Sequence, residues 1–413
     1  MKKAVSMFLA LTMMVVSLTA CGSDNTNDAT NDSKTDAATD EGNTDNTDNN
    51  TDDSSNASGE GVFNIGGIGP LTGDTAIYGT AVKNGAQIAV DEINAAGGIN
   101  GYEIAFNFQD DENDPEKSVN AYNALKDWGI QMLMGTVTSN PCIAVADKTA
   151  ADGVFQITPS GSSTDCIVND NVFQVCFTDP NQGIESGKYI GENKLAEKVA
   201  VIYDSSDPYS SGIAEAFIAE ANNQPFDVVV SEAFTSDSKT DFTVQLQKAK
   251  EAGADMVFLP IYYQEAALII QQANTMGYEP IFCGGDGLDG LLNVENFDTA
   301  LAEDVILLTP FIADAEDDMT KGFVEKYQEQ HKDKPNQFAA DAYDAIYIIK
   351  AAIEESNVTP DMDAKEIGDA LKDAITKISV DGLTGSGMTW ESEGTVNKAP
   401  HAVKIVNGAY EAM

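Results

Sequence analysis

The chain contains no arginine, because all 23 of its basic residues are lysines. Arginine supplies the planar guanidinium group that grips carboxylates and phosphates with two parallel hydrogen bonds. Any carboxylate ligand of this chain must therefore be held by hydroxyl groups, backbone N–H groups and helix N-termini.

Histidine and cysteine are also scarce, with two and five residues in a chain of 413. No two cysteines have CxxC spacing and no histidine cluster accompanies them, so we expect no metal site and no cofactor. The G-x-S-x-G, H-E-x-x-H and P-loop motifs are missing, and we expect neither catalytic residues nor enzyme activity. For Cys166 and Cys176, a disulfide and two free thiols are both open alternatives.

Positive charge is heavily outnumbered, with 67 acidic residues against 23 basic ones and a formal net charge of −44. Nucleic-acid binding depends on lysine and arginine side chains that neutralise phosphates, so this balance excludes a nucleic-acid partner. An acidic surface mainly keeps a protein soluble, and it does not by itself indicate a cationic ligand.

The first twenty residues have the pattern of a secretory signal peptide. Lys2 and Lys3 precede an apolar run over residues 4–16, which is too short to span a bilayer as a mature helix. Leu18-Thr-Ala-Cys21 then resembles a bacterial lipobox, which predicts cleavage after residue 20 and lipidation of Cys21. The alternative is an ordinary signal peptide in which Cys21 is incidental.

Residues 22–60 have the composition of a disordered tether. They contain neither aromatic nor large aliphatic side chains, and eleven acidic residues stand against Lys34 alone. Such a segment cannot bury enough apolar surface to offset the entropy lost on ordering. We therefore expect a lipidated, flexible tether over residues 21–61 and a folded part that begins at Val62.

The folded part alternates apolar runs with amphipathic segments, which is typical of parallel βαβ units. Its length of about 350 residues favours two domains. The expected strands are 62–67, 103–109, 130–135, 154–158, 172–177, 198–203, 226–234, 254–260, 280–284 and 304–309, with short strands over 379–407. The expected helices are 80–95, 115–128, 141–151, 182–193, 209–222, 241–251, 263–276 and 337–355.

The loop after the first strand imitates a dinucleotide-binding fingerprint but does not complete it. Gly67 and Gly69 fit the pattern, whereas the third glycine is replaced by Thr72 and Pro70 interrupts the loop. We therefore do not expect a nucleotide here. Residues 110–114 resemble a calcium loop only superficially, and we interpret them as a strand end before a helix.

Three further loops follow strands at the edge where open α/β sheets bind ligands. In residues 134–141, Ser139 or Asn140 is the expected helix N-cap, which indicates either an anion site or ordinary capping. Residues 157–164 are rich in hydroxyl groups. Asp286 lies between glycines, where its carboxylate could receive an ammonium group or remain in a solvated turn.

Several stretches of the folded part resemble the branched-chain amino-acid-binding proteins that serve ABC transporters. They are Gly69-Pro-Leu-Thr-Gly73, Tyr78-Gly79, Asp91-Glu-Ile-Asn-Ala-Ala-Gly-Gly-Ile-Asn-Gly101, Asp110-Asp-Glu-Asn-Asp-Pro115 and Ile157-Thr-Pro159. The resemblance implies a type I periplasmic-binding-protein fold, an α/β fold of two Rossmann-like lobes joined by a three-crossover hinge. Lobe 1 would be 62–178 plus 311–383, and lobe 2 would be 179–310 plus 384–413.

The resemblance also implies which residues meet the ligand. The ligand carboxylate would meet the hydroxyl groups of Ser139 and Ser162. The ammonium would meet Asp286 and the backbone carbonyl of Ser160. The other residues implied in the site are Val137 and Thr138, with Tyr78, Tyr209, Tyr262 and Phe338 as walls.

The chain departs from the family pattern in three respects. A disulfide found beside the site in many Gram-negative members is absent, because the matching positions are Asn113 and Thr138. Ser162 replaces a common threonine, and Asp286 occurs where a longer glutamate is also found. These changes leave open which side chain the ligand carries.

The expected function is that of a monomeric, lipid-anchored receptor on the outer face of the cytoplasmic membrane, on a Gram-positive cell surface. It would capture an α-amino acid with a branched-chain or aliphatic side chain by hinge closure. It would then deliver this ligand to the permease and ATPase subunits of an ABC transporter. The alternatives are the same fold binding an amide, urea or aromatic acid, and a sensor that reports ligand occupancy.

Overall fold

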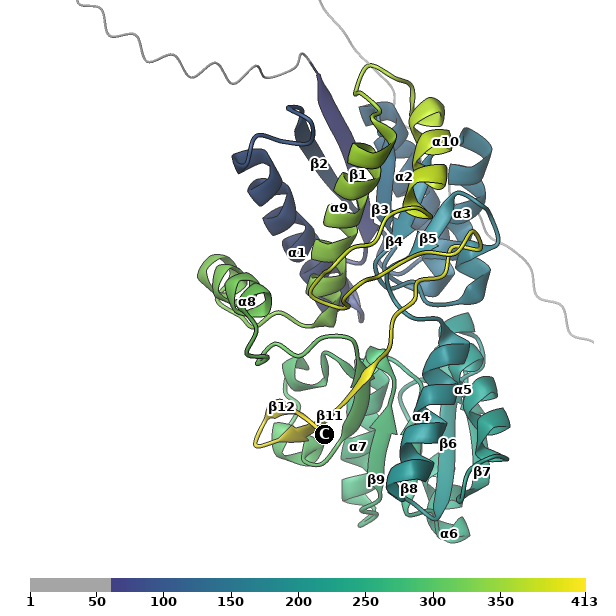
Figure 1. The fold of residues 1–413 in the computed structure, drawn as a ribbon. Coiled ribbons are helices and arrows are strands. Elements are labelled where there is room, and N and C mark those ends of the chain that lie inside the picture. Colours follow the sequence, from purple (N-terminus) through teal and green to yellow (C-terminus); the bar gives the residue numbers. More distant parts are fainter. Residues whose placement is uncertain (1–60) are drawn as a thin grey trace, which may run out of the picture. The chain divides into compact units, whose positions relative to one another are not determined.

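Two largely parallel β-sheets organise residues 61–413, which are the residues that the computed structural model describes (Figure 1). Each sheet is flanked by helices and forms one lobe of this part of the chain. The expected signal peptide over residues 1–20, the lipidation site Cys21 and the acidic tether up to residue 60 lie outside the described residues.

Lobe 1 has a five-stranded parallel sheet in the order β2-β1-β3-β4-β5. Its strands are β1 (Val62–Gly69), β2 (Glu103–Asp110), β3 (Met132–Gly135), β4 (Phe155–Thr158) and β5 (Val172–Gln174). Its helices are α1 (Ala76–Ala95), α2 (Pro115–Trp128), α3 (Ser139–Asp152), α8 (Asp318–His331), α9 (Gln337–Ser356) and α10 (Ala364–Ile375).

Lobe 2 has a seven-stranded sheet in the order β12-β11-β10-β9-β8-β6-β7, in which β11 and β12 are antiparallel additions at one edge. Its strands are β6 (Lys198–Asp204), β7 (Asp227–Phe234), β8 (Met256–Leu259), β9 (Ile281–Gly284), β10 (Ile306–Thr309), β11 (His401–Val406) and β12 (Ala409–Ala412). Its helices are α4 (Asp179–Asn193), α5 (Pro208–Ala221), α6 (Thr243–Ala252) and α7 (Tyr263–Thr275).

Local sequence signals explain where many of these elements begin and end. In α2 the side chain of Asp114 accepts hydrogen bonds from the N–H groups of Glu116 and Lys117, and Pro115 occupies the first turn. The same helix ends at Gly129, whose φ of 92° is left-handed and suits glycine. The expected reading of residues 110–115 as a strand end followed by a helix is confirmed.

One part of the core of lobe 1 lies between its sheet and the helices α1 and α9, which lie side by side (Figure 1), and a second part lies under α2 and α3. Gly85 of α1 permits this packing, because a Cβ atom at that position would be 2.0 Å from the backbone oxygen of Ala339 in α9. Short central strands such as β3 and β8 are buried along their whole length. Continuous apolar strands of this kind are typical of sheets covered on both faces.

The structure contains two helices that the sequence reading did not include. The first, α8, is mostly polar, and it buries only Thr320, Phe323 and Tyr327. The second, α10, had a detectable signal, because Asp363 and Glu366 form a capping box at its start. The short strands expected over 379–407 are reduced to β11 and to isolated bridges such as Val380 with Met388.

The expected boundary between the lobes at residues 383 and 384 requires a correction. The indole Nε1 of Trp390 donates to the carbonyl of Gln174 in β5 at 2.8 Å, and Gln174 N–H donates to Gly394 at 2.9 Å. Residues 384–398 therefore pack on lobe 1, and the chain enters lobe 2 only as it approaches β11. This passage is the third crossover along the chain. The first crossover is residues 175–178, between β5 and α4, and the second is the segment between β10 and α8.

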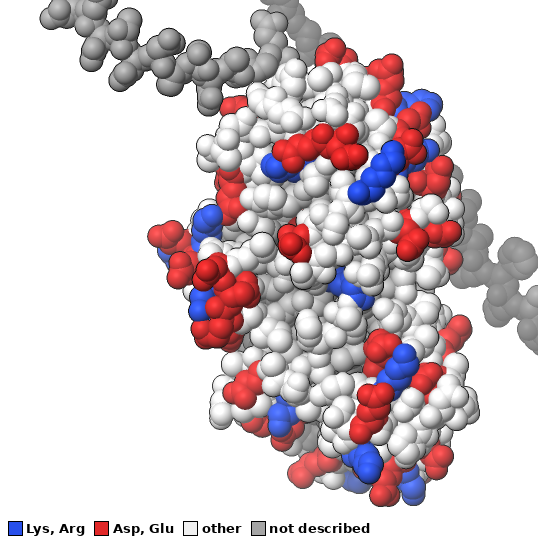
Figure 2. Space-filling view, in the orientation of Figure 1, with Lys and Arg blue, Asp and Glu red and all other residues white. Residues whose placement is uncertain are grey.

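Acidic side chains are spread over both lobes on the face shown in Figure 2, with lysines between them. They gather most densely near α8, whose place is given in Figure 1. Within residues 61–413, no helix combines the length and the apolar character that a membrane span requires.

Candidate functional site

A small cavity lies where the carboxyl ends of the two sheets face each other. It leaves room of only about 10 Å³ for water-sized molecules, far below the roughly 300–1,000 Å³ typical of sites for drug-sized ligands, so its side chains nearly fill it. Its lining residues are Tyr78, Val137, Thr138, Ser139, Ser160, Tyr209, Tyr262, Asp286, Gly287 and Phe338. Larger hollows occur elsewhere, and one of them, lined by Asn140, Asp204 and Tyr262 among others, also lies between strand ends of both sheets.

The topology of the sheets explains why the cavity is here. In lobe 1 the chain order reverses between β1 and β3, and in lobe 2 it reverses between β6 and β8. Open α/β sheets bind ligands outside the carboxyl ends of their strands at such switch points. The loops and helix starts after β1, β3 and β4 supply the lobe 1 side, and those after β6, β8 and β9 supply the lobe 2 side.

The start of α3 forms the lobe 1 wall. The N-cap is Thr138, which corrects the expectation of Ser139 or Asn140, and its side chain makes no capping hydrogen bond. Instead, the Thr138 hydroxyl donates to the Asn113 side-chain oxygen at 2.6 Å. Backbone N–H groups at the start of α3 are therefore not occupied by a side-chain cap, and the helix dipole favours an anion there.

The hydroxyl-rich loop after β4 is fixed against α3. The Ser160 hydroxyl donates to the carbonyl of Val137 at 2.7 Å, and the Ser139 hydroxyl accepts from the N–H of Ser163 at 3.2 Å. Ser162 does not line the cavity, although its side chain is fully buried and its hydroxyl lacks a hydrogen-bond partner among the described residues. The loop thus adds hydroxyl groups beside an anion-favouring helix start.

Asp286 is the acidic group of the cavity and is only 3% exposed. Its carboxylate accepts from the Tyr209 hydroxyl at 2.8 Å, and its backbone N–H donates to the Gln182 side chain at 3.2 Å. Burial raises the pKa of Asp286 from 3.8 to about 7, against the opposing hydrogen bonds of Tyr209 and Gln182. No lysine of the described residues pairs with it, so its charge has no internal counterion.

Aromatic rings close the remaining walls of the cavity. The rings of Tyr209 and Tyr262 stack with centroids 5.0 Å apart, and those of Tyr78 and Phe338 are 4.1 Å apart. The Tyr78 hydroxyl donates to the Gly287 carbonyl, which joins lobe 1 to lobe 2 across the cavity. A ligand between these rings would be largely shielded from water.

Sequence reasoning missed two buried polar residues behind the cavity, Asp179 and Gln182. Asp179 is 1% exposed, and neither of its carboxylate oxygens has a hydrogen-bond partner within residues 61–413. Burial raises the pKa of Asp179 well above the usual range. Gln182 holds the backbone of Asp286, as described above. The available signal was Thr178, whose side chain caps α4 and places both residues at the end of the first crossover.

The other sites considered in the sequence analysis form contacts within the fold. The glycine-containing loop after β1 is tied to Asp110, which accepts from the Leu71 N–H at 2.8 Å and the Thr72 hydroxyl at 2.7 Å. Within residues 61–413, no acidic, histidine or cysteine cluster is arranged to hold a metal ion. The four cysteines of this part, including Cys166 and Cys176, are buried free thiols.

Two Rossmann-like lobes with a small cavity at their facing strand ends define a type I periplasmic-binding-protein fold, which confirms the expected fold class. A family model described as periplasmic binding protein matches residues 62–409. The chain belongs to this family, and within it to the branched-chain amino-acid-binding proteins.

Relatives of the chain carry matching names. The Leu/Ile/Val-binding protein BraC3 of Rhizobium johnstonii is 35% identical over 315 residues, which are 75% of this chain and 83% of that protein. A leucine-, isoleucine-, valine-, threonine- and alanine-binding protein of Pseudomonas aeruginosa is 29% identical over 309 residues, which are 74% of this chain and 80% of that protein.

Solved structures share the fold. The branched-chain amino acid transporter substrate binding protein LivJ of Streptococcus pneumoniae, in complex with isoleucine, has a TM-score of 0.77 and 29% identity, and the match covers 85% of this chain and 98% of that one. The leucine binding protein LivK of Thermotoga maritima has a TM-score of 0.76 and 25% identity, with 85% and 97% covered.

Proposed function

We propose that this protein is the extracellular substrate-binding component of an ABC importer, and that it captures an α-amino acid with a branched aliphatic side chain. The observation that carries the proposal is the buried carboxylate of Asp286, which has no counterion among residues 61–413. It lies in one small aromatic cavity with the start of α3, whose N-cap side chain makes no capping hydrogen bond. A zwitterionic amino acid offers an ammonium to the first and a carboxylate to the second.

Each part of the ligand has a partner in the proposed site. The ligand carboxylate is held by N–H groups at the start of α3 and by the hydroxyl group of Ser139, whereas Ser162 lies outside the cavity lining. The ammonium is held by Asp286 and by the carbonyl of Ser160. Charge-assisted hydrogen bonds of this kind are worth roughly 1.5–3 kcal/mol each. The lining by Tyr78, Val137, Thr138, Tyr209, Tyr262 and Phe338 shields the aliphatic side chain from water.

Binding proceeds by closure of the two lobes and involves no covalent chemistry. The ligand first meets one lobe of an open form, and bending at the crossovers then brings the other lobe onto it. Contacts such as the hydrogen bond from Tyr78 to Gly287 belong to the closed form, because these residues come from opposite lobes. Closure excludes water, which strengthens the pairing between Asp286 and the ammonium.

We further propose that lipid on Cys21 anchors the mature chain to the outer face of the cytoplasmic membrane, with residues 22–60 as tether. The bound amino acid is then passed to the permease, and the ATPase subunits drive uptake. A monomer suffices for this delivery. The tether composition and the lipobox resemblance support this arrangement, and acyl chains contribute about 0.8 kcal/mol per buried methylene group.

The function is tested by a thermal-shift screen of the chain lacking residues 1–21. The screen contains all amino acids together with urea, aliphatic amides and aromatic acids. A ligand at a hundred times its dissociation constant stabilises a protein by about 2.7 kcal/mol, which shifts the melting temperature measurably. We expect shifts confined to a few aliphatic amino acids. A response only to amides or to acids without an ammonium would contradict the proposal.

A further inference from the structure

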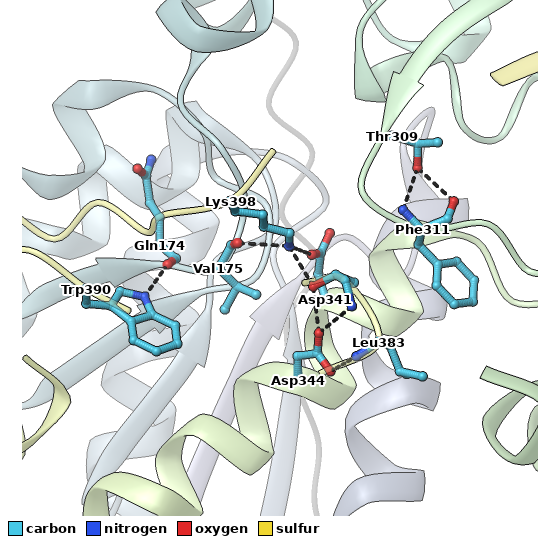
Figure 3. Close-up of polar contacts among 10 residues, drawn as sticks. Gln174, Val175, Thr309, Phe311, Asp341, Asp344, Leu383, Trp390 and Lys398 are labelled. Carbon is cyan, nitrogen blue, oxygen red and sulfur yellow. Dashed lines mark hydrogen bonds and ion pairs between the residues drawn. The ribbon is translucent and has the colours of Figure 1, made fainter. Parts of the chain in front are cut away.

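Lys398 is a buried lysine at the place where the first and third crossovers leave lobe 1 (Figure 3). Its side chain is 0% exposed, and its ammonium donates to three acceptors from separate parts of the chain. These are the carbonyl of Val175 at 3.0 Å, the carboxylate of Asp341 at 2.7 Å and the hydroxyl of Thr384 at 2.6 Å. One side chain thus joins both crossovers to helix α9.

A second carboxylate of α9 completes the cluster. Asp344 accepts from the N–H of Leu383 at 2.8 Å and from the N–H and hydroxyl of Thr384 at 2.9 and 2.6 Å. Asp341 and Asp344 are three residues apart, so they lie on one face of the helix. The segment that leads to the third crossover is therefore fixed to α9 at two successive turns.

Helix α9 also reaches the proposed ligand site. Its first turn carries Phe338, which lines the cavity three residues before Asp341. The neighbouring N–H of Gln337 donates across the lobes to the carboxylate of Asp289 at 2.8 Å. The first crossover, which Lys398 holds at Val175, leads directly into α4 and the residues behind Asp286. The ammonium of Lys398 is thus connected to both walls of the cavity.

We propose that Lys398 is a positioning residue for ligand capture. It fixes the lobe 1 end of the hinge about which the two lobes close. By holding Val175, Asp341 and Thr384 together, it confines the bending of two crossovers to residues 176–178 and 399–400. Each closure then returns Asp286 to the same place opposite the start of α3. This inference rests on the proposed function, because it concerns how the same site is assembled.

Stability alone does not explain a buried ion pair at this position. Taking two charges out of water is costly, and replacement of a buried pair by apolar residues of similar volume is often neutral or stabilising. Removal of only one partner leaves an uncompensated charge and is strongly destabilising. A double replacement therefore separates the structural role of the pair from its effect on the hinge.

The test uses the mature chain without its lipid and compares four proteins. They are the wild type, Lys398→Met, the double variant Lys398→Met with Asp341→Leu, and the control Lys404→Met. Lys404 lies on β11 and forms an exposed pair with Asp304 at 2.9 Å, so its replacement removes an ammonium near the hinge without touching the cluster. Melting temperature shows which variants are folded, and the double variant keeps the test valid if Lys398→Met does not fold.

The first readout does not depend on any ligand. Spin labels attached through Asp127→Cys on α2 and Glu251→Cys on α6, both exposed positions of opposite lobes, report the distance between the lobes. We expect the double variant to melt within a few degrees of the wild type but to have a clearly broader distribution of distances. An unchanged distribution would overturn the proposal, whatever the protein binds.

The second readout is the dissociation rate of L-isoleucine, measured by stopped flow. We expect dissociation at least tenfold faster in the double variant and unchanged in Lys404→Met. An isoleucine affinity equal to that of the wild type in the double variant would also overturn the positioning role. If the wild type itself does not bind isoleucine, the proposed ligand is wrong, and the distance distributions still decide the role of Lys398.

Discussion

The cavity and the hinge each contain a buried aspartate, but only the hinge supplies a counterion. Asp341 is fully buried and pairs with the ammonium of Lys398 at 2.7 Å. Asp286 is almost as buried, and among residues 61–413 its carboxylate has neutral neighbours instead, with the Tyr209 hydroxyl donating to it at 2.8 Å. The hinge therefore carries a cation of its own, which acts on both Asp341 and Asp344, whereas no lysine of residues 61–413 pairs with the carboxylate of the cavity.

Burial raises the pKa of both Asp341 and Asp286, but the contacts that lower it again differ between the two. The ammonium of Lys398 is the largest factor that lowers the pKa of Asp341, while hydrogen bonds alone do so for Asp286. Pairing with a ligand ammonium is expected to contribute strongly to the binding free energy at Asp286, because this carboxyl group is already removed from water in the folded protein. We therefore expect substitutions in the two regions to act on different quantities.

The largest effect is expected from Asp341→Leu, which leaves the ammonium of Lys398 buried without its partner. Breaking a buried pair in this way costs about 3–5 kcal/mol of the free energy of unfolding. Chemical denaturation measures this loss. The matched change Asp286→Asn removes no internal ion pair, and it should leave the ligand-free protein as stable as the wild type or slightly more so. Equal losses in both variants would remove the distinction between the two regions.

The next effect is the loss of binding in Asp286→Ala. The ammonium of the ligand would be buried without a charged partner, which costs about 2–5 kcal/mol and lowers the affinity for isoleucine by at least roughly thirtyfold. Isothermal titration calorimetry measures this loss, and a preserved melting temperature shows that the fold is intact. Wild-type affinity in this variant would contradict the role assigned to Asp286.

The affinity for isoleucine should fall as the pH decreases through about 7. Burial places the pKa of Asp286 near this value, so at lower pH its carboxyl group is protonated and cannot pair with an ammonium. Well below this pKa, the affinity for isoleucine should fall by about tenfold per pH unit, because one proton must be lost before the ligand binds. Titrations between pH 5 and 8 should show this slope in the wild type and none in Asp286→Asn.

The stability of the ligand-free protein should respond to pH with the opposite sign. Because the pKa of Asp286 is raised on folding, its contribution favours the folded state below its ordinary pKa of 3.8 and is lost as the pH rises to about 7. Denaturation of the wild type and Asp286→Asn over this range isolates the contribution. A difference between the two proteins that grows in favour of the wild type with rising pH would contradict the raised pKa.

The smallest effect is expected beside the cavity, at the hydrogen bond between Thr138 and Asn113. Thr138→Val removes a donor at 2.6 Å and should cost about 1 kcal/mol of the free energy of unfolding. Thr138→Ser keeps the hydroxyl and serves as the control. Equal stability of both variants would show that this hydrogen bond contributes nothing.

Most strands and most loops of the site were predictable, because their signals are local. Apolar runs separated by amphipathic helices give the parallel sheets, and the carboxyl ends of the strands then select the loops with Ser139, Ser160 and Asp286. The resemblance to a family added the aromatic walls. The expected N-cap of α3, Ser139 or Asn140, was wrong by one or two residues, because the hydroxyl of the actual N-cap, Thr138, has a tertiary partner instead of a capping role.

The cluster of Lys398, Asp341, Asp344 and Thr384 at the hinge could not be predicted in the same way. Lys398 and its acceptors Val175 and Asp341 are separated by 223 and 57 residues, and no local pattern marks a lysine as buried. The boundary between the lobes was misplaced for a related reason, since residues 384–398 lack regular strands and are held on lobe 1 by single tertiary contacts. Pairings of this kind follow from the completed fold, and periodicity does not reveal them.

The central claim is that Asp286 forms an ion pair with the ammonium group of a bound ligand. Calorimetric titration of the wild type and Asp286→Asn with L-isoleucine and with its deaminated analogue, 3-methylpentanoate, tests this claim most directly. We predict that the wild type binds isoleucine at least a hundredfold more tightly than the analogue, and that this preference disappears in Asp286→Asn. Equal affinity of the wild type for both compounds would contradict the claim.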